Sequence, residues 1–193
     1  QDPALVPVAA LLDPAGDDFE VSGGGANMWF TNDALHFVWT RVSGDFTLES
    51  AVEWLGGGGD PHRKACLLVR QDLDPDSVYA DVAVHGDGLT SLQFRDRKGG
   101  LTREVQLSEK EPERVGLVRQ GEVLYATAGK ADGKMQAAGA FMRVRFEEPV
   151  YVGLGVCAHD DKAVETARFR KVSLRHGGPA TTNRVLHSTL ETI

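Results

Sequence analysis

The sequence has few cysteines and no excess of positive charge, and each of these absences excludes a class of protein. Its 193 residues contain two cysteines, Cys66 and Cys157, which are too few for a disulfide-rich scaffold. They either form one bridge between two strands or are two free buried thiols. The formal net charge of −7 argues against nucleic acid as a partner, because phosphate binding needs a clustered basic field.

Long apolar runs are also missing. No run approaches the ~20 residues that span a bilayer, so we expect no membrane insertion. The stretch 5–12 is short and contains Pro7, which makes it neither an anchor nor an intact signal peptide. The chain begins at Gln1 without Met, which fits a mature secreted protein or a trimmed chain.

The most informative stretch covers residues 22–54 and predicts paired antiparallel strands. Three glycines at 23–25 permit a hinge or a close backbone approach. The alternation after them predicts that Leu35, Phe37 and Trp39 face the core, with His36 and Val38 on the other face. A hairpin turn at 43–45 then leads into a second alternating strand, 46–54.

Further short strands follow at a spacing of about 8–12 residues, which is typical of a β-sandwich or barrel. No window keeps a helical period for more than a turn or two, so we expect less than about a tenth helix. The domain is expected at 19–176. An N-terminal segment, 1–18, precedes it, and a tail or linker, 177–193, follows it.

Several phrases of the sequence are similar to one known family. They are GGGANMWFTNDALHFVW, SGDFTLESAVEW, KACLLVRQDLDPDSVYADVAV, SLQFRDRKGG, RVGLVRQGEVLYA, ADGK and YVGLGVCAHDD followed by ARFRKVSL. In this order they resemble the concanavalin A-like domains found beside β-xylosidase-type enzymes and in relatives of the yeast regulator of enolase. The resemblance implies an all-β jelly-roll sandwich of two antiparallel sheets, without catalytic activity and with a carbohydrate as the suspected ligand.

The last eleven residues, NRVLHSTLETI, resemble the entry into a TolB-type β-propeller. This resemblance implies that the domain is the N-terminal module of a longer periplasmic protein. We therefore expect a secreted or periplasmic location.

A candidate ligand site follows from the alternate positions of the strands. If the apolar positions face the core, the polar ones lie on the opposite face, where a jelly roll is concave. Guanidinium groups offer planar donor forks, and carboxylates and amides bind hydroxyls. The candidate ligand-binding residues are His36, Glu49, Arg70, Asp81, Gln93, Arg95 and His159. The alternative is a solvated sheet face with cross-strand ion pairs.

The sharpest expectation is that Arg70, Asp81, Arg95 and His159 converge in one concave patch, with Gln93 between them. A strand that slipped by one residue would expose its apolar side chains, so the register decides which face each residue occupies.

A glycoside hydrolase is the main alternative function, with Glu49 and Asp81 as the two carboxylates. The clustered E-x-D-x-E strand of catalytic jelly rolls is absent from the sequence, and so is a G-x-S-x-G nucleophile elbow. A second alternative is a structural accessory domain that orients a neighbouring propeller. The leading hypothesis is a non-catalytic carbohydrate-binding or interaction module that is monomeric or weakly dimeric, with a glycan or a protein as its partner.

No cofactor is expected, and the alternative is a Ca²⁺ ion bound by one acidic loop. Asp72, Asp74 and Asp76 alternate in the sequence DLDPD, where carboxylates with nearby carbonyls could bind Ca²⁺. The other interpretation is a turn whose aspartates cap local N–H groups. A single histidine before Asp160 and Asp161, with no second histidine at ligand spacing, argues against zinc.

Overall fold

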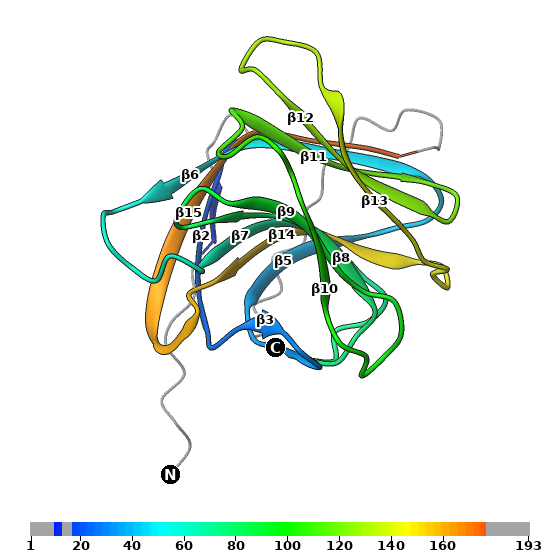
Figure 1. Ribbon diagram of the computed structural model, residues 1–193, viewed down its shortest axis with the longest axis horizontal. Helices are drawn as coiled ribbons and strands as arrows, with labels where there is room; N and C mark the ends of the chain where they lie inside the picture. Colours follow the sequence, from blue (N-terminus) through cyan, green and yellow to red (C-terminus); the bar gives the residue numbers. More distant parts are fainter. Residues whose placement is uncertain (1–9, 13–16, 177–193) are drawn as a thin grey trace.

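Two large antiparallel β-sheets pack face to face in the structure, a computed structural model that describes residues 10–12 and 17–176 (Figure 1). No helix occurs in these described ranges. The prediction of an all-β jelly-roll sandwich is confirmed. The tail 177–193, with its propeller-like phrase, lies outside the described residues.

One sheet has seven strands. Their order across the sheet is β1 (Ala10–Leu12), β2 (Phe19–Gly25), β15 (Asp160–His176), β6 (Phe46–Leu55), β11 (Arg114–Gln120), β12 (Val123–Gly129) and β13 (Gln136–Arg143). The first of these strands comes from the predicted N-terminal segment and pairs with β2. Gly23–Gly25, expected as a hinge, form the end of β2.

The other sheet has six strands, and a small hairpin accompanies it. The order is β10 (Arg103–Gln106), β9 (Thr90–Arg95), β8 (Tyr79–His85), β7 (Lys64–Arg70), β14 (Val150–Cys157) and β5 (His36–Val42). The hairpin pairs β3 (Met28–Trp29) with β4 (Asn32–Asp33). In Figure 1 the label β3 lies below the strands of the six-stranded sheet.

The main core lies between the two large sheets. Leu67, Val82 and Leu92 come from the six-stranded sheet, and Leu48 and Leu117 come from the seven-stranded one. All five are buried, and burial of such a side chain contributes roughly 1.5–3 kcal/mol. The strands β6, β7, β8 and β9 therefore keep the inward faces that their alternation predicts.

The orientation predicted for β5 was wrong. Val38 lies in the main core, whereas Leu35 and Phe37 belong to a second apolar cluster, against which Trp39 packs. This cluster lies on the outer face of the six-stranded sheet, because its members Cys66 and Leu68 alternate along β7 with core residues. Alternation could not identify the inner face, since both faces of this strand carry buried apolar side chains.

The second cluster exists because residues 26–35, which we call the strap, cross the outer face of the six-stranded sheet. Met28 and Leu35 from the strap are buried in the cluster. Gly25, at the start of the crossing, has a φ of 110°. An added Cβ there would lie 2.0 Å from the carbonyl oxygen of Ala34, so glycine permits both the backbone conformation and the close approach.

Candidate functional site

Four of the predicted site residues share the outer face of the six-stranded sheet. Arg70 pairs with Tyr79 across β7 and β8, and Tyr79 pairs with Arg95 across β8 and β9. Asp81 lies two residues further along β8 and pairs with Gln93. Direct cross-strand partners point to the same face of a sheet, so the register argument for these four is confirmed.

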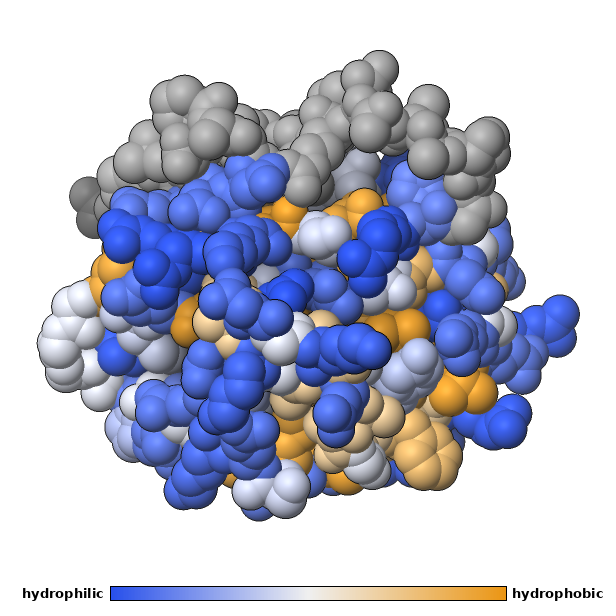
Figure 2. Space-filling view, turned by 90° about the horizontal axis from the view of Figure 1, so that it is seen from above, coloured by the Kyte–Doolittle hydropathy of each residue, from blue (hydrophilic) through white to orange (hydrophobic). Residues whose placement is uncertain are grey.

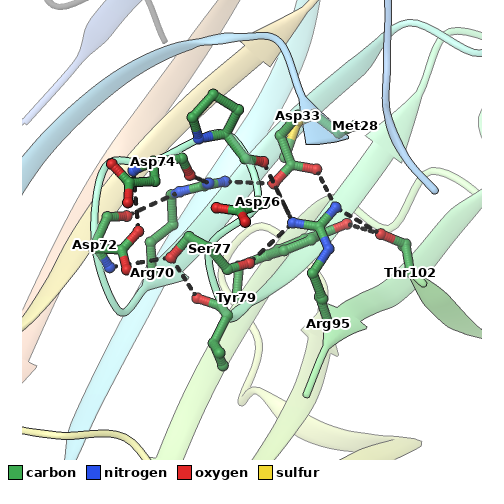
Figure 3. Close-up of polar contacts among 12 residues, drawn as sticks. Met28, Asp33, Arg70, Asp72, Asp74, Asp76, Ser77, Tyr79, Arg95 and Thr102 are labelled. Carbon is green, nitrogen blue, oxygen red and sulfur yellow. Dashed lines mark hydrogen bonds and ion pairs between the residues drawn. The ribbon is translucent and has the colours of Figure 1, made fainter. Parts of the chain in front are cut away.

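The two arginines bind Asp33 of the strap (Figure 3). The Oδ2 atom of Asp33 accepts hydrogen bonds from Nη1 of Arg70 and from Nη1 of Arg95, each at 2.8 Å. Its Oδ1 atom accepts a third, from Nη2 of Arg95, also at 2.8 Å. None of the three side chains is exposed to solvent. We call this set, Arg70 and Arg95 around one carboxylate, the arginine clamp.

Most other donors of the clamp are satisfied by backbone carbonyls. Arg70 donates to the carbonyls of Asp72 and Asp74, and Arg95 donates to those of Gly100, Ser77 and Phe30. Such charge-assisted bonds offset the cost of burying guanidinium groups.

The concave groove expected here is closed in the structure. The exposed fractions of Arg70, Asp81, Gln93 and Arg95 are 0–1%. The strap covers this face, and its carboxylate takes the place between the arginines. The sequence argument missed Asp33 because a single aspartate in a turn-prone stretch carries no signal of a distant partner.

Asp81 and Gln93 lack the partners that the arginines have. Within the described part of the chain, no group makes a hydrogen bond of good geometry to either carboxylate oxygen of Asp81 or to Oε1 of Gln93. The thiol of Cys66 and the backbone of Gln93 lie close to the carboxyl. Burial raises the pKa of Asp81 to about 8, although nearby Lys64 acts in the opposite direction.

His159 does not join these residues. Tyr151 of β14 lies beside Arg70, whereas Cys157 lies beside Lys64, so His159 follows the far end of the strand pair. Six residues of β-strand separate the two ends, which is about 20 Å. Its ring lies 5.5 Å from that of His62, and burial lowers its pKa.

His36 was also assigned to the wrong face. It pairs with Val156, a residue of the main core, and its Nδ1 atom lies 2.9 Å from the carbonyl oxygen of Ser22. Burial lowers the pKa of this imidazole. The side chain is therefore a hydrogen-bonded part of the interior.

Glu49 belongs to the other sheet, which contradicts the proposed glycosidase pair. It lies on β6 between the core residue Leu48 and buried Ser50, and it faces outward to Arg114 and Arg175, each at 3.2 Å. Asp81 lies on the outer face of the opposite sheet. The core separates the two carboxylates, so they cannot flank one glycosidic bond.

The acidic loop holds a lysine. Nζ of Lys98 lies 3.4 Å from Asp72, 2.6 Å from Asp74 and 2.8 Å from Asp76. Hydrogen bonds to Asp74 and Asp76 raise the pKa of Lys98. Asp72 also accepts a hydrogen bond from the backbone of Asp74, as the turn interpretation predicts.

The two cysteines are free and buried in the second apolar cluster. Burial raises the pKa of both thiols, and for Cys66 the nearby Asp81 adds to the effect. Among the described residues, no group of three or more His, Cys, Asp or Glu side chains could hold a metal ion.

An open cleft of about 710 Å³ lies at one end of the sandwich, and we call it the end cleft. The end of β6, the segment 111–114 and part of β15 line it. The guanidinium carbon of Arg63 lies 4.4 Å from the ring centroid of Trp54, and both residues line the cleft. The Nε1 atom of Trp54 donates to the carbonyl of His85, which holds the ring in place.

Charged groups of both signs line the end cleft. Arg170 pairs with Glu53 at 3.1 Å within the cleft, while Arg63 and Arg114 pair with Glu165 and Glu49 outside it. Each of these cations already has a carboxylate partner, which favours a neutral polar ligand over a strongly charged one. Figure 2 shows one face of the molecule, which is mostly hydrophilic with small, separated apolar patches.

No protein-family model matches the chain. No curated protein matches it either. Solved structures do share its fold. A Saccharomyces cerevisiae protein of unknown function is 14% identical, with a TM-score of 0.62, over 89% of this chain and 97% of that one.

Two carbohydrate-related proteins are also similar in structure. GH43B of the Bacteroides ovatus xyloglucan PUL is 15% identical over 82% of this chain, with a TM-score of 0.56, and the match covers 32% of its own length. The carbohydrate-binding module CBM66 of Bacillus subtilis is 14% identical, with a TM-score of 0.50, over 87% of this chain and 91% of that one. These similarities establish the fold, which is a concanavalin-like jelly-roll sandwich of two antiparallel sheets.

Proposed function

We propose that the chain is a non-catalytic glycan-binding module and that the end cleft is its binding site. The observation that carries this proposal is the indole of Trp54 in a cleft of about 710 Å³, with charged donors and acceptors around it. A pocket of this size with an aromatic wall and a few polar groups suits a small polar ligand. The similarity to CBM66 supports the same function.

The location and the partner are part of the proposal. The module acts outside the cytoplasm, as the family resemblance implies, and works as a monomer or a weak dimer. The structure has no described helix that is long and apolar enough to cross a membrane. A structural accessory domain beside a propeller is the competing proposal.

A glycan array followed by calorimetry with the selected neutral glycan tests the proposal. We expect Trp54→Ala to weaken binding at least tenfold, or roughly 1.4 kcal/mol, because it removes the aromatic wall of the cleft. Trp39→Ala is the matched control, since Trp39 is also partly buried but lies outside the cleft. Because Trp54 packs partly against the core, Glu53→Gln provides a second, milder change in the same cleft.

Equal losses of glycan affinity in the Trp54 and Trp39 variants would contradict the assignment of the binding site to the end cleft. Assays for reducing sugars run in parallel, and we expect no turnover. If the wild-type protein binds no glycan on the array, the result would favour the accessory domain.

A further inference from the structure

The strap covers the outer face of the six-stranded sheet, but it supplies hydrogen-bond partners to only some of the buried polar groups there. At one end it supplies a carboxylate to the arginine clamp. Beside the clamp it leaves buried polar atoms that have no hydrogen-bond partner of good geometry among the described residues. These two observations are independent of each other and of the end cleft, which shares no residue with the clamp.

The arginine clamp has the geometry of a carboxylate receptor. Its donors come from two different strands of the sheet, Arg70 on β7 and Arg95 on β9, and converge on a carboxylate from a separate segment. Paired guanidinium donors recognise the planar shape of a carboxylate as well as its charge. Asp33 therefore occupies a position that a free carboxylate would also fit.

The acceptors beside the clamp fit hydroxyl groups. Both oxygens of Asp81 and Oε1 of Gln93 are buried without a hydrogen-bond partner in the described part of the chain. Their neighbours on this face include Met28 of the strap, Leu68 and Ala83, whose side chains cannot donate, while the Cys66 thiol and the Gln93 backbone lie close to Asp81 without a hydrogen bond of good geometry. Buried polar atoms without partners are rare in folded proteins, so each of them needs an explanation.

The distance between the arginine clamp and the pair of Asp81 and Gln93 matches the length of one sugar ring. Asp81 and Gln93 each lie two residues along their strands from Tyr79 and Arg95, which corresponds to about 7 Å. This is about the length of a six-membered sugar ring that carries a carboxylate at one end and hydroxyls at the other.

We propose that this face is a second binding site, for a uronic acid, and that the strap competes with the sugar for it. The carboxylate of the sugar binds the arginine clamp in place of Asp33, and its hydroxyls form hydrogen bonds with Asp81 and Gln93. The strap must leave the face for this exchange, so the site is closed in the unliganded chain.

The test uses the full chain with Asp33→Ala, which removes the internal carboxylate and keeps both arginines. We expect a lowered Tm that glucuronate restores saturably, by roughly 5–10 °C at about 100 times its Kd. Glucose at equal concentration and sodium chloride at equal ionic strength should not restore it. Asp161→Ala, a surface change outside this face, should show no shift with any of these solutes.

Formate provides the second arm, because it carries the carboxylate without the ring. Restoration by formate but not by glucuronate would overturn the assignment of a sugar. Restoration by neither would overturn the site itself.

If Asp33→Ala does not fold, wild-type hydrogen exchange decides the question. A uronic acid oligomer should speed the exchange of amides in residues 26–35 at least tenfold, whereas a neutral oligomer of the same length should not. Equal exchange with both oligomers would refute the competition.

Discussion

Both carboxylate oxygens of Asp33 accept hydrogen bonds from the guanidinium of Arg95, at 2.8 Å each, and neither side chain is exposed to solvent. A lysine at position 95 cannot supply the two parallel donors of this pair. We expect Arg95→Lys to lower the free energy of unfolding by about 3–5 kcal/mol, the usual cost of breaking a buried ion pair. Urea denaturation measures the change.

The exposed pair of Arg103 and Asp96 serves as the control. Solvent screens this pair, so Arg103→Lys should change stability by less than about 1 kcal/mol. Similar losses in the two variants would show that burial of the Asp33 network contributes no special stability.

Asp81 should make the protein less stable as the pH rises. Its pKa in the folded state is about 8, against an ordinary value of 3.8, because the carboxyl is buried. Between these two values the folded state binds more protons than the unfolded state, so stability falls through this window as the pH increases. The loss should be on the order of 3–6 kcal/mol. Thermal unfolding measured at pH values from 4 to 9 follows this loss of stability.

Asp81→Asn is the matched variant, since an amide has nearly the same shape and does not titrate in this range. Its stability should change much less over the same window and should exceed that of the wild type at pH 9. A wild-type slope that persists in this variant would assign the effect to another group.

The two thiols should be unreactive in the folded protein. Cys66 and Cys157 are buried, and burial raises the pKa of both, so little thiolate exists at neutral pH. We expect Ellman's reagent to label neither cysteine in native buffer and both in urea. Fast labelling without denaturant would mean that the strap opens readily.

Gly153 should not tolerate a side chain. A Cβ at this position of β14 would lie 1.9 Å from the carbonyl oxygen of Val38 on the neighbouring strand. Gly153→Ala should therefore destabilise the fold by at least about 1–3 kcal/mol, because the two strands must separate. Gly57→Ala is the control, since nothing lies within 4 Å of its added Cβ. Denaturation midpoints measure this change. Comparable midpoints for the two variants would contradict the close packing of β5 and β14.

The sequence predicts most of the architecture because the main core follows a simple rule. Along β7, Ala65, Leu67 and Val69 face the core and Arg70 faces outward, as the alternation requires. The rule fails at β5, where Phe37 of the second cluster and Trp39 packed against it alternate with the core residue Val38. Both faces of this strand are apolar, so alternation does not identify the inner one.

The site was harder to predict because its contacts join distant parts of the chain. The partner of Arg95 is Asp33, 62 residues away, and a pattern of local alternation contains no information about such a pair. Trp54 packs partly against the core and also lines the end cleft, where the guanidinium of Arg63 lies over its ring. Arg63 follows a glycine-rich loop, and the local pattern does not predict this contact.

The position of β15 has a consequence for how the chain folds during synthesis. β15 pairs with β2 on one side and with β6 on the other, and Glu20 and Arg168, 148 residues apart, are in contact across one of these pairings. Strands β1 and β2 thus reach the seven-stranded sheet only through a strand that the ribosome delivers after all the others described. Until then the backbone groups of β2 that pair with β15 have no partner in this sheet, and such long-range pairings form slowly. A growing chain of this kind is open to aggregation over most of its translation, and a chaperone that shields β2 would matter more for its yield than for its final stability.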